Sequence, residues 1–194
     1  MEIGATKAVQ DRLKTTKIEE SKGASLVFCW DTHLTKIKGR NVLFIVNASN
    51  RYTIAMTDIE PRNWNYYTMY IRRVIHGVMQ EMGYSEDQIG QYFKMSGDTT
   101  VTKTHGRKSV GGINRMVMDA QYFGKKLEKE AKYQWELSEY LNRDICQPEG
   151  FDAYGYPSEL FKLDMERLGI AAKRKPAKII DFTKYIDTNR STNH

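Results

Sequence analysis

The hydrophobic period of the sequence changes once, near residue 64, and this change decides most of the fold. Before it, short runs of β-branched and aromatic residues occupy residues 26–30, 34–37, 42–46 and 52–56. Turn-forming residues separate the later runs, which is typical of an antiparallel meander. After it, apolar residues recur every three or four positions, as on amphipathic helices. The order predicts an α+β fold in which several helices pack on one face of a small antiparallel sheet.

The helical segments have recognisable ends. A short helix is expected at residues 6–14, and a longer one from Trp64 that stops at Gly83. Residues 85–88 have the capping-box pattern, which predicts a further helix through Phe93. Residues 96–108 are polar and indicate a loop with a short strand at 99–102. Continuous periodicity from residue 113 to 141 predicts one long helix, and residues 158–168 predict the last.

Charge divides the chain into a domain over residues 1–170 and a basic tail over 171–194. The net charge is +6, and the tail supplies +4 of it through six basic and two acidic residues. Its Lys173, Arg174 and Lys175 can contact phosphate backbones or acidic partners, or can simply be solvated. The longest uncharged apolar run is too short to span a bilayer, and the N-terminus lacks a secretory pattern. We expect a cytoplasmic protein with no membrane partner.

Cysteine and histidine are too scattered to predict a metal centre. The two cysteines, Cys29 and Cys146, cannot build a disulfide scaffold or a four-thiolate zinc site. Cys29, Asp31 and His33 share one face of a predicted strand, but Cys29 and His33 are roughly 13 Å apart along it. We therefore expect no metal, no cofactor and no catalytic residues, and a domain that folds without metal.

The segment before the long predicted helix is the strongest candidate binding site. Lys103, Arg107 and Lys108 are positive, and Gly111 and Gly112 would leave the first N–H groups of the helix uncovered. Exposed helix N–H groups beside Arg and Lys form a ready anion site, with Ser109 as the N-cap. The alternative is that the glycines allow close packing and the charges are solvated, because no phosphate-loop glycine spacing is present.

A second candidate surface lies on the helix after residue 64. Tyr66, Tyr70, Arg72 and Arg73 could stack on and neutralise single-stranded nucleic acid. The chain contains 12 tyrosines, and tyrosine is enriched in contact surfaces. The alternative is that these residues form the solvated side of a core helix.

Three stretches of the sequence resemble a known bacterial family. They are Trp-Asp-Thr-His-Leu at residues 30–34, the run from Lys103 through Arg107 and Gly111 to Asn114, and Tyr-Gly-Tyr-Pro at residues 154–157. Together they resemble the family catalogued as domain of unknown function 6933, over about residues 6–168. The family pattern differs at Asp31 and His33. The resemblance implies one α+β domain of bacterial or phage type and no assigned activity.

Three classes of function fit these observations. The first is a non-enzymatic binding protein of phage or plasmid type that docks on nucleic acid or on a nucleic-acid-processing defence complex. It includes phage counter-defence inhibitors such as anti-CRISPR proteins, and this setting rests on the resemblance. The second is a small metal-independent nuclease or toxin-like enzyme that uses Lys103, His105 and Arg107. The third is a structural or oligomer-forming protein. The absence of a coherent catalytic set favours the first.

Overall fold

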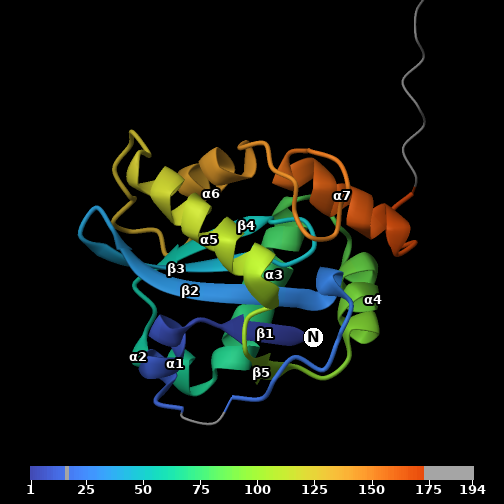
Figure 1. Cartoon of the computed structure of the whole chain (residues 1–194), viewed down its shortest axis with the longest axis horizontal. Helices are drawn as coiled ribbons and strands as arrows, with labels where there is room; N and C mark the ends of the chain where they lie inside the picture. The colour runs from blue at the N-terminus through green and yellow to red at the C-terminus, as the bar shows by residue number, and fades with distance from the viewer. Residues whose placement is uncertain (16–17, 173–194) are drawn as a thin grey trace, which may run out of the picture.

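The structure is a computed structural model that describes residues 1–15 and 18–172 (Figure 1). Its strands are β1 (Glu2–Ala5), β2 (Cys29–Ile37), β3 (Arg40–Asn47), β4 (Thr53–Thr57) and β5 (Thr100–Thr102). Its helices are α1 (Lys7–Leu13), α2 (Pro61–Asn65), α3 (Tyr67–Glu81), α4 (Glu86–Ser96), α5 (Gly106–Gln121), α6 (Trp135–Asn142) and α7 (Pro157–Arg167). These elements form a mixed α+β fold, as the sequence predicts in outline.

The five strands form one mixed sheet in the order β4-β3-β2-β1-β5. The predicted meander is present, because β2, β3 and β4 pair antiparallel. However, β1 pairs parallel with both β2 and β5, so the prediction of a purely antiparallel sheet is wrong. The first and second predicted strand runs also join into the single strand β2, preceded by a 3₁₀ turn at Leu26–Phe28.

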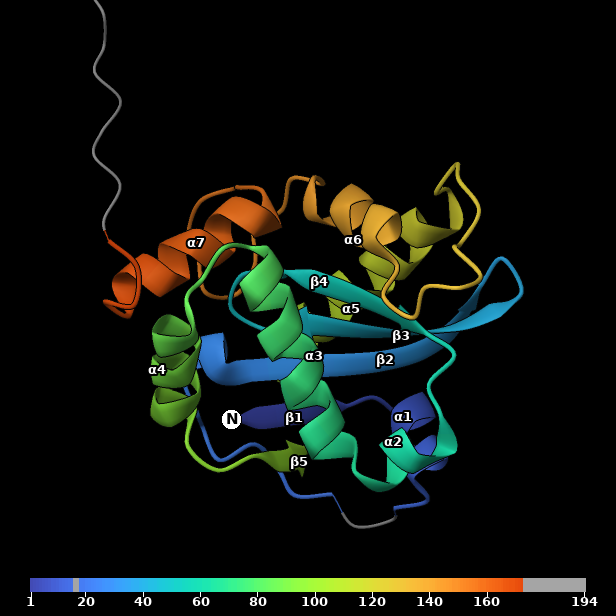
Figure 2. The same ribbon diagram turned by 180° about the vertical axis from the view of Figure 1, so that it is seen from behind.

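Helices cover both faces of this sheet, and the prediction of helices on one face is therefore wrong as well. Helices α5 and α6 lie in front of the sheet in Figure 1, whereas α3 crosses the other face in Figure 2. Side chains alternate between the faces of a strand, and both sets on β3 are apolar. Val42, Phe44 and Val46 pack with α5 and α6, and Leu43 and Ile45 pack with α3, α4 and α7. Apolar residues on both faces of a central strand require a layer on each side.

The predicted long helix over residues 113–141 is two helices with a connection between them. Helix α5 ends at Gln121, and α6 starts only at Trp135. The chain between them runs along the outer edge of β4, where Thr57 donates its N–H to Lys132 and Gln134 donates its N–H to Ala55. Phe123 and Leu127 in this connection are still buried against the front face. The apolar period of the sequence thus continues after the helix has ended. The helix can end here because hydrogen bonds to the open edge of β4 replace those of a continued helix.

Helix α6 completes the closure of the β4 edge with polar side chains. Ser138 Oγ accepts the N–H of Ala55 at 3.0 Å. The amide of Asn142 accepts the N–H of Thr53 and donates to its carbonyl, both at 2.8 Å. Ser138 and Asn142 are each 1% exposed, so water cannot replace these bonds.

Several local predictions are confirmed. Helix α3 ends next to Gly83, which has a φ of +88°, a conformation that favours glycine. Ser85 and Gln88 form the predicted capping box of α4. Strand β5 lies within the expected residues 99–102.

Two expectations concern the ends and the environment of the chain. The basic residues Lys173, Arg174 and Lys175 lie outside the described residues. Within the described part of the chain, no helix is both long enough and apolar enough to cross a membrane.

Replacement of Asn142 by leucine tests the closure of the β4 edge. The Asn142→Leu variant leaves the N–H and the carbonyl of Thr53 buried without partners, and we expect it to lose about 2–4 kcal/mol of unfolding free energy. The neighbouring Arg143→Ala variant removes only an exposed ion pair with Glu139 and should change stability by less than about 0.5 kcal/mol. Urea unfolding measures both. Equal effects of the two substitutions would contradict this role of Asn142.

Candidate functional site

The most concentrated polar chemistry lies where β1, β2 and the β5–α5 connection meet beneath the start of α5. The parallel register places Glu2 beside Cys29 and Gly4 beside Asp31, on the face that α5 covers. His105 immediately precedes α5 and brings its ring onto these residues. Residues far apart in the sequence therefore form one group, which we name the Asp31–His105–Glu2 cluster.

The imidazole of His105 lies between two carboxylates. Its Nδ1 is 2.7 Å from Oδ1 of Asp31, and its Nε2 is 3.0 Å from Oε2 of Glu2. The side chains of His105, Asp31 and Glu2 are only 3%, 0% and 5% exposed. Two buried acceptors at hydrogen-bond distance favour an imidazolium ring that donates from both nitrogens.

Other donors complete the bonding of both carboxylates. Asp31 also accepts the backbone N–H of His105, at 3.2 Å, and the hydroxyl of Ser109 in α5. Glu2 accepts the hydroxyl of Ser21 at 2.6 Å and the N–H of Lys22 at 2.8 Å. Asp31 therefore binds the first turn of α5 directly to β2.

Burial and hydrogen bonding act in opposite directions on these groups. Burial alone would lower the pKa of His105, but interactions with Asp31 and Cys29 raise that pKa to about 10. Burial alone would raise the pKa of Glu2, but hydrogen bonds from Ser21, Lys22 and His105 lower it. The cluster thus holds its histidine charged and Glu2 ionised at neutral pH.

Gly4 allows Asp31 to take this position. A Cβ at residue 4 would lie 1.8 Å from Oδ1 of Asp31 and 3.0 Å from Cα of Thr104. The first contact is not possible in a packed structure and the second is tight, so any side chain here must displace the Asp31 carboxylate. The glycine is therefore a steric requirement of the cluster.

Cys29 lies close to a histidine that the sequence did not reveal. The sequence argument compared Cys29 with His33 on the same strand, but His33 bonds to Thr6 instead. The histidine near Cys29 is His105: ligand atoms of Glu2, Cys29 and His105 all lie within 4.8 Å of one another. The sequence argument did not consider His105, because only the β5–α5 connection brings it next to Cys29.

The predicted anion site is rearranged in the structure. Helix α5 begins at Gly106, so Gly111 and Gly112 lie in its second turn and do not expose its first N–H groups. Ser109 is not the N-cap, because it lies within the helix and bonds to Asp31. Gly112 instead approaches the side chain of Arg51, which donates to its carbonyl at 2.8 Å. These features of the prediction are wrong because the helix starts earlier than its apolar period does.

The three predicted cations differ in their surroundings. Lys103 pairs with Glu20, and Lys108 lies 3.9 Å from Glu149 and donates to the carbonyl of Pro148. Arg107 is exposed and forms no ion pair or hydrogen bond with the residues that the structure describes. All three remain at the same end of α5.

The second predicted surface is not continuous. Arg72 donates to Thr99 at 2.8 Å, and its guanidinium lies 4.4 Å from the ring centre of Phe93, so it joins α3 to α4. Tyr70 is half-buried, whereas Tyr66 is 64% exposed and Arg73 is exposed. Arg72 therefore has a structural role that the sequence did not indicate.

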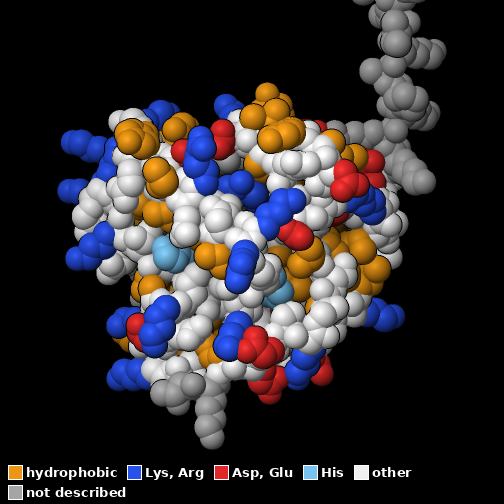
Figure 3. Space-filling view, in the orientation of Figure 1, with side chains coloured by type: hydrophobic (Ala, Val, Ile, Leu, Met, Phe, Trp, Pro, Cys, Tyr) orange, Lys and Arg blue, Asp and Glu red, His pale blue; other side chains and the backbone are white. Residues whose placement is uncertain are grey.

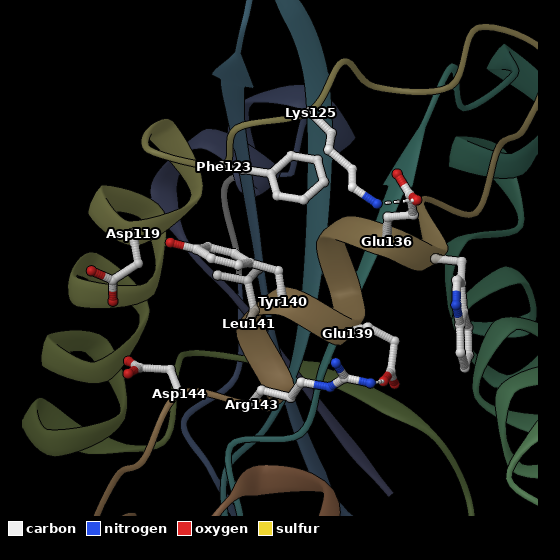
Figure 4. Close-up of a pocket in the computed structure, with 10 residues that line it drawn as sticks. Asp119, Phe123, Lys125, Glu136, Glu139, Tyr140, Leu141, Arg143 and Asp144 are labelled. Carbon is white, nitrogen blue, oxygen red and sulfur yellow. Dashed lines mark hydrogen bonds and ion pairs between the residues drawn. The ribbon is translucent and has the colours of Figure 1, made fainter.

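A groove of about 550 Å³ opens between α5, α6 and their connection (Figure 4). Three of its four carboxylates are paired, two of them within the groove, where Glu136 binds Lys125 and Glu139 binds Arg143. Asp119 pairs with Arg115 outside the groove. A ligand site usually has free polar groups that point toward one spot within an apolar cavity. This groove does not combine these two features, so we do not assign it a ligand.

Sequence reasoning missed Glu2 and the contact between Asp31 and His105. The available signal is the alternation of Glu2 and Gly4 with Ile3 and Ala5, which is the pattern of a strand with one polar face. No local signal shows that β5 delivers His105 to this strand.

The structure defines a small α+β protein with a mixed five-stranded sheet, covered on both faces, and a buried ionic cluster beneath one helix. The chain belongs to the family Domain of unknown function (DUF6933), whose family model matches residues 2–160. The match confirms the resemblance seen in the sequence. Comparison with curated proteins and with solved structures finds no match.

Substitution of Gly4 tests the steric argument for the cluster. Gly4→Ala should destabilise the protein by about 1–3 kcal/mol or more, because the added methyl group displaces the Asp31 carboxylate. Gly77→Ala in α3 is the matched control, since a Cβ there meets nothing within 4 Å. It should be neutral or stabilise by up to about 1 kcal/mol. A Gly4→Ala variant with the same melting temperature as the wild type would contradict the described packing.

Proposed function

We propose that this protein is a non-enzymatic binding protein that docks on nucleic acid, or on a nucleic-acid-bound complex, through the outer face of α5. The observation that carries the proposal is the charge at the start of this helix. Its first turn contains Arg107 and Lys108 and no acidic residue. Figure 3 shows Lys and Arg side chains spread over the face that α5 covers.

This charge arrangement is the reverse of what stabilises a helix. The N-terminal end carries the positive end of the dipole, so a cation there is unfavourable by about 0.3–1 kcal/mol. Helices α4, α6 and α7 follow the favourable rule, with Glu86 and Asp87, Glu136, and Glu159 in their first turns. Lys7 and Arg62 lie in the first turns of α1 and α2, which contain no acidic residue, but they pair with Asp11 and Glu60. Arg107 differs from Lys7 and Arg62 because no described acidic residue pairs with it. An unpaired cation at a helix start is expected where a ligand supplies the missing negative charge.

The exposed residues of α5 are suited to a phosphate backbone. Arg107, Lys108 and Arg115 are exposed, and Asp119 is the helix's one acidic residue. Arg107 has no ionic partner among the described residues, so it can bind a phosphate without breaking an existing pair. Lys173, Arg174 and Lys175 would add further non-specific attraction.

The burial of His105 argues against the nuclease alternative. A general acid or base must reach the substrate, but the His105 side chain is 3% exposed and both ring nitrogens face carboxylates. Lys103 and Arg107 alone could stabilise negative charge, but they do not form an acid–base pair with His105. We therefore prefer binding to catalysis, and we place this activity in the cytoplasm.

The biological setting that we propose is a phage or plasmid one, with counter-defence inhibition as the specific form. An inhibitor that binds the nucleic acid of a defence complex needs a rigid, positively charged surface and no catalytic centre. The purely structural or oligomer-forming alternative does not explain why cations occupy the unfavourable end of α5.

Charge reversal at the start of α5 tests the proposal. We expect the Arg107→Glu/Lys108→Glu variant to bind labelled single-stranded DNA, duplex DNA or RNA at least about 10-fold more weakly than the wild type, since each charge-assisted bond that it removes contributes about 1.5–3 kcal/mol. Fluorescence anisotropy at several salt concentrations measures affinity and salt slope. The slope should fall by about 0.7–0.9 for each phosphate that the variant no longer neutralises.

A second charge reversal separates the site from the overall charge. Lys126→Glu/Lys129→Glu makes the same change in net charge on exposed residues of the α5–α6 connection. This control should reduce affinity much less. Equal reductions in the two variants, or a wild type that binds none of the three nucleic acids at low salt, would overturn the proposal.

A further inference from the structure

Three side chains of the types that bind transition metals meet beneath α5. Glu2 offers a carboxylate oxygen, Cys29 a sulfur and His105 a ring nitrogen, and these atoms all lie within 4.8 Å of one another. Ligand atoms bound to one zinc ion are roughly 3.3–3.7 Å apart. Small side-chain rotations are enough to reach that spacing, and Nε2 of His105 is already 3.0 Å from Oε2 of Glu2.

The other ring nitrogen of His105 has the partner that a metal ligand needs. Nδ1 lies 2.7 Å from the carboxylate of Asp31, which leaves Nε2 directed toward Glu2. A carboxylate bound to the distal nitrogen fixes the tautomer and orientation of a metal-binding histidine. Ser109 and the N–H of His105 in turn hold Asp31. Asp31 and its own hydrogen bonds thus fix the orientation of the His105 ring and leave Nε2 available to bind a metal.

The charge of the cluster is compatible with a bound cation. Glu2 and Asp31 are 4% and 0% exposed, and among the described residues no Lys or Arg side chain bonds to either. One imidazolium offsets only one of the two carboxylates. A divalent ion bound by Glu2, by neutral His105 and by the Cys29 thiolate replaces two protons, those of the thiol and of Nε2, which leave to solvent, so the net charge of the cluster stays at about −1.

We propose that Glu2, Cys29 and His105 form a binding site for a divalent transition metal, with zinc as the best match. Thiolate and imidazole ligands favour zinc, whereas magnesium and calcium require oxygen ligands. Three protein ligands leave a fourth position for water. The side chains are almost fully buried, so this site joins β1, β2 and the start of α5 and does not admit a substrate.

Cobalt(II) provides a direct test, because a cobalt–thiolate bond produces a charge-transfer band in the near ultraviolet. The full chain is treated with a chelator, exchanged into chelator-free buffer and titrated with Co²⁺, then with Zn²⁺. We expect a saturable band at one equivalent that zinc abolishes. Cys29→Ser should lose the band. Cys146→Ser is the matched control, a buried thiol outside the cluster, and should keep it.

A second measurement does not depend on how the variants fold. X-ray absorption of the zinc-loaded wild type should show one sulfur ligand at about 2.3 Å together with nitrogen and oxygen ligands. No thiolate band at saturating Co²⁺, a band that persists in Cys29→Ser, or a zinc shell without sulfur would overturn the proposal. None of these outcomes depends on nucleic-acid binding, so the two proposals fail or stand separately.

Discussion

The contact between the Asp31 carboxylate and His105 determines how α5 sits on the sheet. Asp31 binds the ring and backbone of His105 and the hydroxyl of Ser109, so one buried side chain of β2 holds the start of the helix. The position of β1 depends on the same contact, because only glycine at residue 4 leaves room for the carboxylate. Arg107 follows His105 by two residues and is exposed.

A buried ionic cluster that joins two elements has a large free-energy cost of desolvation. Removing charges from water costs several kcal/mol for each ion, and well-packed apolar residues often stabilise a protein as well or better. The front core shows that this chain can use the apolar solution, since Ile113 and Met116 attach the same helix to Phe44 and Val46. The charges at the start of α5 fit a role besides stability. The metal site that we propose at Cys29 and the binding surface that we propose around Arg107 each give such a role.

Local patterns predicted the parts of the fold whose causes are local. The meander from β2 to β4 depends on strand alternation and turns, and the start of α4 depends on the Ser85 capping box. The break between α5 and α6 was missed because Phe123 and Leu127 keep the apolar period after the helix ends. Gln134 and Lys132 leave the helical path to pair with a strand edge that only the tertiary structure creates.

In the candidate site, too, some residues have a local sequence signal and others are brought together only by the tertiary structure. Lys103, Arg107 and Lys108 could be identified from composition, but the residues that organise them could not. Glu2, Asp31 and His105 are separated by 29 and 74 positions in the chain, and their contact follows from the parallel pairing of β1 with β2 and β5. Parallel pairing leaves no short-range sequence signal, since the connection is long.

Hydrogen exchange of the Asp31→Asn variant tests most directly whether this cluster fixes α5. The asparagine keeps the shape of the side chain but removes the charge and one acceptor for Ser109. The account predicts that amides of α5 lose much more protection than those of the central strand β3, because the helix can now open while the sheet remains folded. Loss of protection that is equal in α5 and β3, or unchanged protection of α5, would contradict the central role of the Asp31–His105 contact.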